Sequence, residues 1–178
     1  DTLTVDSSVS LSIPVTFEGG SGNDTLTAPD TLDTWTISGD DSGTVTATGA
    51  EGITFAEVEN LTGGEGADVF FFENGGSLNG MIDGGEGADT VAGADTANTW
   101  NITGADSGSL NGQVFNSIEN LLGGSDQDDF VLGDGAGVTG TIDGGGGEDT
   151  LDYSAYTTGI TVNLVTNEST GTAGLSNI

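Results

Sequence analysis

The sequence predicts an all-β fold, a right-handed parallel β-solenoid of about eight coils of roughly 20 residues each. Three observations predict it. A turn rich in glycine and aspartate recurs along the chain, short strand-like runs lie between the turns, and 33 of the 178 residues are glycine. Glycine interrupts every window long enough for a helix, so no helix is expected.

The turns recur at a spacing of about 20 residues, which is typical of solenoid coils that stack in parallel. Their first residues are Gly19, Ser38, Gly63, Gly84, Thr103, Gly123 and Gly144. One turn per coil accounts for this spacing.

Two longer blocks repeat within the chain, over residues 33–90 and 98–150. Trp35 recurs as Trp100, and Asn60 recurs as Asn120. Both ends of the sequence fall inside a repeat, so we expect residues 1–178 to form one continuous solenoid segment that belongs to a longer array or filament.

Short runs between the turns alternate apolar with polar residues, as strands with one buried face do. Examples are 34–37, 69–72 and 160–164. The alternation predicts that Trp35 and Ile37 share one face, and that Ile160, Val162 and Leu164 share another. In a solenoid these faces point into the core.

The charge balance is extreme, with 29 acidic residues, no Lys, Arg or His, and a formal net charge of −29. No side-chain salt bridge can form, so each carboxylate must be solvated, hydrogen-bonded or bound to a metal ion. Phosphate recognition depends on Lys and Arg, which argues against nucleic acid as a partner. No apolar run is long enough to predict membrane insertion.

The candidate binding motif is a nonapeptide, G-G-x-G-x-D-x-U-x, in which U is a large apolar residue. It reads G-G-S-G-N-D from Gly19, G-G-E-G-A-D from Gly63, G-G-E-G-A-D from Gly84 and G-G-G-G-E-D from Gly144, with a degenerate G-G-S-D-Q-D from Gly123. This pattern resembles the RTX-type calcium-binding β-roll repeats, and the long blocks resemble those of very large bacterial secreted surface and adhesin proteins.

The resemblance implies Ca²⁺ as the bound ion, with the sixth-position aspartate and the carbonyl groups of the glycine positions as ligands. The residues it assigns are Asp68, Asp89, Asp128, Asp149, Asp24, Gly64, Gly66, Gly85, Gly87, Gly124, Gly145 and Gly147. Calcium takes six to eight oxygen ligands, and turns stacked about 4.8 Å apart can supply them jointly. We therefore expect the turn at 63–68 to pair with that at 84–89, and 123–128 with 144–149. Two departures from the family pattern are a single turn per coil and Asp126 at the fourth glycine position.

Three functions are compatible with this pattern. The first is an extracellular or cell-surface structural segment that folds on binding Ca²⁺, with neighbouring repeats or end-to-end copies of itself as partners. The second is an adhesin module that binds a glycan or another surface. A carboxylate-only β-helix enzyme is the third, and we expect no enzyme, because the acidic pairs 40–41 and 128–129 recur with the repeat, whereas an active site is a single constellation.

Overall fold

A computed structural model describes residues 1–6, 13–47 and 52–178, and these residues form β-strands and no helix. The expectation of an all-β chain is confirmed. The strands are β1 (Thr2–Thr4), β2 (Val15–Glu18), β3 (Thr25–Thr27), β4 (Asp33–Gly39), β5 (Ser42–Ala47), β6 (Ile53–Ala56), β7 (Asn60–Gly64), β8 (Val69–Phe72), β9 (Met81–Gly85), β10 (Thr90–Ala92), β11 (Thr99–Gly104), β12 (Ser107–Leu110), β13 (Gln113–Asn116), β14 (Asn120–Gly124), β15 (Asp129–Leu132), β16 (Thr141–Gly145), β17 (Thr150–Asp152), β18 (Val162–Asn163), β19 (Glu168–Ser169) and β20 (Gly174–Ser176). No helix that could cross a membrane occurs in the three described ranges.

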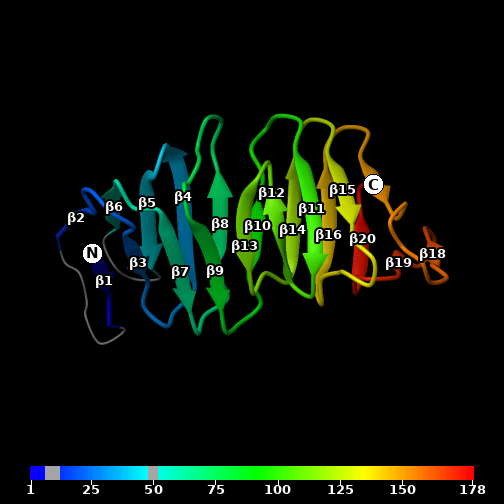
Figure 1. Ribbon diagram of the computed structural model, residues 1–178, viewed down its shortest axis with the longest axis horizontal. Coiled ribbons are helices and arrows are strands. Elements are labelled where there is room, and N and C mark those ends of the chain that lie inside the picture. The colour runs from blue at the N-terminus through cyan, green and yellow to red at the C-terminus, as the bar shows by residue number, and fades with distance from the viewer. Residues whose placement is uncertain (7–12, 48–51) are drawn as a thin grey trace.

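Two sheets of nine strands contain most of the chain. Sheet A has the order β1-β3-β7-β9-β13-β12-β11-β15-β17, and sheet B has the order β2-β6-β5-β4-β8-β10-β14-β16-β20. The strands lie across the long axis of an elongated molecule, with the N-terminus near one end and the C-terminus near the other (Figure 1). The short pair β18–β19 lies beyond β20 at the C-terminal end (Figure 1).

Between β7 and β10 the chain alternates between the two sheets, with β7 and β9 in sheet A and β8 and β10 in sheet B. Leu61 pairs with Ile82, and Phe70 pairs with Val91, so each round trip takes 21 residues. This matches the turn spacing in the sequence. We call the side where the chain passes from sheet A to sheet B the lower edge, and the side where it returns the upper edge, as they lie in Figure 1.

The turns that begin at Ser38 and Thr103, which share the sequence D-S-G at 41–43 and 106–108, differ from the expectation, because they are hairpin turns rather than corners between sheets. The first joins β4 to β5, the second joins β11 to β12, and each continues as an antiparallel pair into β6 or β13. Asp41 and Asp106 adopt left-handed conformations there, with φ of 48° and 50°. Both large sheets are therefore mixed, with one antiparallel three-stranded meander each.

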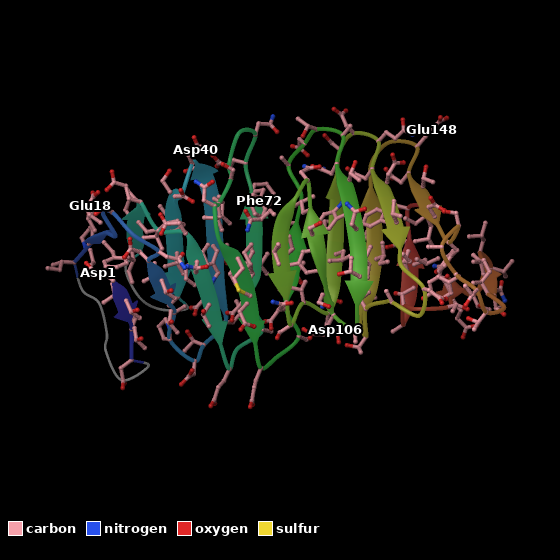
Figure 2. All side chains as sticks on the ribbon, viewed as in Figure 1. Asp1, Glu18, Asp40, Phe72, Asp106 and Glu148 are labelled. Carbon is pink, nitrogen blue, oxygen red and sulfur yellow. The ribbon has the colours of Figure 1, made fainter. Side chains whose placement is uncertain are left out.

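The two sequence blocks lie on opposite sides of the molecule. From β4 to β10 the chain visits the sheets in the order B-A-B-A-B, where the three strands β4, β5 and β6 make up the first visit. The second block therefore begins in sheet A, with β11. Figure 2 shows the result, with Asp40 of the first hairpin at the top and Asp106 of the second at the bottom. The second block is thus related to the first by a half-turn about the long axis.

A single apolar core runs between the sheets. Trp35 and Trp100 are fully buried, as the alternation of the sequence predicts. Trp35 stacks on Phe70 with ring centroids 5.5 Å apart, and Trp100 stacks on Phe130 at 5.6 Å. The same stack therefore recurs in both blocks, once from each sheet.

The prediction for residues 160–164 is wrong. Only Val162–Asn163 forms a strand there, and Ile160, Val162 and Leu164 are 45%, 44% and 70% exposed. The alternation places these side chains on one face, but the neighbouring strand is the short β19 and no further strand covers that face among the described residues.

Candidate metal centre

The structure brings together the turn pairs that the sequence predicts. The turns at 63–68 and 84–89 are neighbours on the lower edge, where Gly64 pairs with Gly85. The turns at 123–128 and 144–149 are neighbours on the upper edge, where Gly124 pairs with Gly145. The two pairs are on opposite edges because of the half-turn between the blocks.

On the lower edge, acidic side chains form a ladder of hydrogen bonds with main-chain amides. The Asp33 amide donates to Oδ1 of Asp68 at 2.8 Å, and the Asp68 amide donates to Oδ1 of Asp89 at 2.7 Å. The Asp89 amide donates to Oε2 of Glu119 at 2.7 Å. We call these four residues the lower ladder.

The upper edge carries an equivalent arrangement. The Asn98 amide donates to Oδ1 of Asp128, and the Asp128 amide donates to Oδ1 of Asp149, both at 2.8 Å. We call these three residues the upper ladder. Nearer the N-terminal end, the Asp24 amide donates to Oε2 of Glu59 at 2.6 Å. The neighbour of Asp24 is therefore the E-N-L segment at 59–61, which is repeated at 119–121, rather than a second glycine turn.

The ladders leave buried carboxylate oxygens without a partner. Asp33, Asp68 and Asp89 of the lower ladder, Asp128 of the upper ladder, and Asp24 have no exposed surface, and their Oδ2 atoms accept no hydrogen bond. Burial raises the pKa of Asp68 and Asp89 to about 6 and raises the pKa of Asp128 as well. A buried, unpartnered anionic oxygen costs several kcal/mol unless a proton or a cation neutralises it.

The first glycine of each turn is required by the aspartate that closes the turn. A Cβ atom at Gly63 would lie 2.2 Å from Oδ2 of Asp68, and one at Gly84 would lie 2.5 Å from Oδ2 of Asp89. The same contact recurs at Gly123 with Asp128, at 2.3 Å. The carboxylate therefore occupies the space that a side chain would fill, which explains the spacing of first glycine and sixth aspartate.

Glycines inside the turns serve two purposes. Gly64, Gly85, Gly87, Gly145 and Gly147 have φ between 85° and 140°, where L-residues are rare. Gly66 and Gly124 do not have positive φ, but a Cβ there would meet main-chain carbonyl oxygens of the neighbouring turn at 1.9 Å and 2.4 Å. Asp126, at the fourth position of its turn, is likewise not among the positive-φ residues, so its backbone carries no left-handed strain.

The donor set suits a hard cation held mainly by main-chain oxygens. No group of three or more acidic side chains converges closely enough to hold a metal within the described ranges. The lower turn pair instead offers two buried carboxylate oxygens, of Asp68 and Asp89, and the upper pair offers one, of Asp128, beside carbonyl groups that stack in register. Carbonyl and carboxylate oxygens together are the ligands that Ca²⁺ takes.

The sequence reasoning missed three ladder residues, Asp33, Asn98 and Glu119, and it missed Glu59, the acceptor for the Asp24 amide. Asp33 and Asn98 close the irregular connections at 28–33 and 93–98, and they stack directly against Asp68 and Asp128. The available signal is a shared hexapeptide, which reads D-T-L-D-T-W from Asp30 and D-T-A-N-T-W from Asp95. The two glutamates belong to the repeated E-N-L.

The asparagine of E-N-L has a structural role in both blocks. Asn120 donates from Nδ2 to the Asp89 carbonyl at 3.2 Å, and its Oδ1 accepts from the Thr141 amide at 3.1 Å. Asn60 makes the same two bonds, to the Asp24 carbonyl and from the Met81 amide. Each asparagine thus links the strands on both sides of it.

The acidic pairs considered as catalytic candidates do not form an isolated constellation. Both oxygens of Asp41 accept hydrogen bonds from Asn79, at 2.7 and 2.6 Å. In the second block, Asp106 accepts from Thr139 in the same way. Asp128 is buried in the upper ladder while Asp129 faces solvent. These carboxylates are engaged in repeated structural contacts.

Comparisons of this chain with family models, with curated proteins and with solved structures return no match. The functional interpretation therefore depends on the geometry of the two ladders.

Proposed function

We propose that this chain is a calcium-stabilised structural segment, a right-handed β-solenoid of the RTX type that serves as an extracellular rod, filament or adhesin extender. The observation that carries the proposal is the repeated buried aspartate whose Oδ2 has no partner, at Asp24, Asp68, Asp89 and Asp128 in the glycine turns and at Asp33, which stacks on Asp68. A buried ionised carboxylate oxygen without a hydrogen-bond partner is costly, and a bound cation would offset that cost.

Asp68 and Asp89 on the lower edge, and Asp128 and Asp149 on the upper edge, would hold the ions together with main-chain oxygens of the glycine positions. Bound Ca²⁺ would supply positive charge between stacked turns. The protein cannot provide this charge itself, because it has 29 acidic residues and no positively charged side chain. Each ion would therefore join one turn to the next and offset the repulsion between them.

Coupling between ion binding and folding supports an extracellular location. Extracellular calcium modules bind their ions with dissociation constants near 10⁻⁴ to 10⁻³ M. At lower calcium concentrations the chain would be weakened by its own repulsion, and it would become a stiff rod on exposure to millimolar calcium. The repetition of the ladders along the molecule suits a mechanical role better than catalysis at one site.

Calcium titration followed by circular dichroism and thermal unfolding tests the proposal. We expect the thermal midpoint to rise with calcium and to fall again with a chelator. Asp68→Ala and Asp89→Ala should remove most of the calcium-dependent rise, whereas Glu65→Gln, which removes a charge from an exposed position in the same turn, should retain it. A melting temperature that is unchanged by calcium in the parent chain would refute the proposal.

A further inference from the structure

The connections at 28–33 and 93–98 occupy the same place in the two blocks, and each ends in a buried side chain. Asp33 is fully buried, and its counterpart Asn98 is 2% exposed. Each of them donates its main-chain amide to the carboxylate of a glycine turn at 2.8 Å. The two side chains are similar in shape, but only asparagine has N–H groups to donate. The two blocks therefore differ here by a carboxylate in place of an amide.

In the second block, the side-chain amide of Asn98 satisfies carbonyl groups of its own connection and of the stacked glycine turn. Its Nδ2 donates to the Ala94 carbonyl at 3.0 Å and to the Thr96 carbonyl at 2.7 Å. The Gly123 carbonyl accepts from the same Nδ2 at 3.4 Å. The Asn98 Oδ1 accepts from Nδ2 of Asn111 at 2.9 Å. Both polar atoms of this side chain have partners, so nothing at this position requires a cation.

In the first block, Asp33 cannot make the same bonds, because an ionised carboxylate has no proton to donate. Its Oδ1 accepts from Oγ1 of Thr31 at 3.0 Å, whereas its Oδ2 is buried and accepts no hydrogen bond from the described residues. The main chain of the connection is nevertheless alike, since the Pro29 and Ala94 carbonyls each accept the amide two residues later at 2.7 Å. The first block thus keeps the carbonyl groups that Asn98 satisfies in the second block, but it replaces their donor with an anionic group.

A second carboxylate and two carbonyl groups of the same connection lie against the stacked glycine turn. Asp30 Oδ1 and the Pro29 carbonyl oxygen would each lie 3.2 Å from a Cβ atom at Gly64. The Thr31 carbonyl oxygen would lie 1.9 Å from a Cβ atom at Gly66. No side chain of these glycines separates the oxygens from the main chain of the turn. Carboxylate and carbonyl oxygens together are the ligands that Ca²⁺ takes.

We propose that the connection at 28–33 and the glycine turn at 63–68 hold a divalent cation between them, at a site that the glycine motif does not specify. Its ligands are carboxylate and carbonyl oxygens of the connection, from Asp33, Asp30, Pro29 and Thr31. In the second block, the side-chain amide of Asn98 takes the place of this ion. The inference rests on the proposed function, because it assigns the same ion, Ca²⁺, to a further position.

The two ladders accordingly differ in the number of ions that they bind. Among the described residues, the lower ladder has three buried Oδ2 atoms without a partner and the upper ladder has one. One ion between each pair of neighbouring aspartates gives the lower edge two ions, at Asp33 with Asp68 and at Asp68 with Asp89. The upper edge has a single such pair, Asp128 with Asp149. The amide of Asn98 closes the upper ladder without an ion.

Exchanging the two side chains tests the proposal, with bound calcium counted by equilibrium dialysis. Asp33→Asn gives the first block the amide of the second block, so we expect one bound ion fewer than in the parent chain and a higher thermal midpoint in chelator. Asn98→Asp makes the reverse change, so we expect one additional ion and a lower thermal midpoint in chelator. Calcium should restore the midpoint of Asn98→Asp, because the new ion offsets the new buried charge.

Asp30→Asn and Asp95→Asn form a matched pair, because these exposed aspartates occupy the same position of the shared hexapeptide. Asp30→Asn removes a ligand and should raise the dissociation constant of one ion. Asp95→Asn removes the same charge beside Asn98, and it should leave the number of ions and their dissociation constants unchanged.

The inference is overturned if Asp33→Asn binds as many calcium ions as the parent chain, or if Asn98→Asp binds no more than the parent chain. The second variant decides the matter where the first does not fold. Either result would leave the proposed function intact, since the parent chain would still bind calcium at its glycine turns. A parent chain that binds no calcium would instead refute the proposed function and this site with it.

Discussion

Replacing Asp68 with asparagine is expected to have opposite effects on stability with and without calcium. Asp68 is fully buried, its Oδ1 accepts the Asp33 amide, and its Oδ2 has no partner. Asn keeps an acceptor for the Asp33 amide and removes the charge. The variant therefore separates the hydrogen bond from the ionised carboxylate.

Without calcium, Asp68→Asn should increase the free energy of unfolding at pH 7. Burial raises the pKa of Asp68 from 3.8 to about 6, and a shift of two units corresponds to about 3 kcal/mol of penalty on the ionised form. The variant avoids this penalty, so its gain is at most about 3 kcal/mol. The new amide N–H lowers that gain by about 1–3 kcal/mol if it finds no acceptor.

With calcium, the same substitution should decrease stability. An ion present at 100 times its dissociation constant stabilises the folded state by about 2.7 kcal/mol, and the variant loses a ligand for that ion. The change caused by the mutation should therefore differ between the two conditions by about 3 kcal/mol. Any cost of the new amide N–H is common to both conditions and cancels in this difference.

Urea unfolding monitored by circular dichroism, in calcium and in chelator, measures both values. Glu65→Gln is the matched control, because Glu65 is in the same turn but exposed, and it should change stability little in either condition. The reasoning is wrong if Asp68→Asn changes the free energy of unfolding equally with and without calcium.

Three further predictions concern pH, turn geometry and the E-N-L asparagines. Burial raises the pKa of Asp33, Asp68 and Asp89 to about 6, above the unfolded value of about 3.9, so the folded metal-free chain binds more protons than the unfolded chain between these values. Its thermal midpoint in chelator should consequently rise as the pH falls from 7 to about 5, and a steady decrease over this range would contradict the ladder as described. Gly85→Ala should destabilise by more than the roughly 1–2 kcal/mol cost of a left-handed backbone, because its Cβ would lie 2.1 Å from the Gly64 carbonyl oxygen. Gly75→Ala, with a φ of 91° and open space around it, should show only the backbone cost in urea unfolding, and equal losses would exclude the close approach. Asn120→Ala should cost about 1–3 kcal/mol because the Thr141 amide loses its acceptor, whereas Asn74→Ala, in a turn at the end of β8, should be nearly neutral.

The sequence alone identified the residues of the turns and the neighbours within each pair. Glycine and aspartate positions are strict because the Asp68 carboxylate lies against Gly63 and the Asp89 carboxylate against Gly84. A local steric requirement of this kind leaves a local sequence pattern. The burial of Trp35 and Trp100 was also predictable, since alternation along a strand fixes which face a side chain occupies.

The closing positions of irregular turns were not predictable from the motif. Asp33 and Asn98 enter the ladders because they end connections, at 28–33 and 93–98, that stack on glycine turns later in the chain. Asp33 meets Asp68, 35 residues later, and Asn98 meets Asp128, 30 residues later. Nothing within 28–33 or 93–98 reproduces the glycine pattern. Their role depends on long-range stacking, which a single sequence does not display.

The sequence by itself determined the strands, the spacing of the turns and the excess of negative charge, because each of these follows from residues near one another in the chain. Only the tertiary structure decided which sheet the strands around the D-S-G turns occupy. These segments could be corners or hairpins on local grounds, and the choice depends on whether β4 and β11 find antiparallel partners in β5 and β12. That pairing keeps β5 in sheet B and β12 in sheet A, so each sheet contains an antiparallel meander and the chain does not cross the core between β4 and β6 or between β11 and β13.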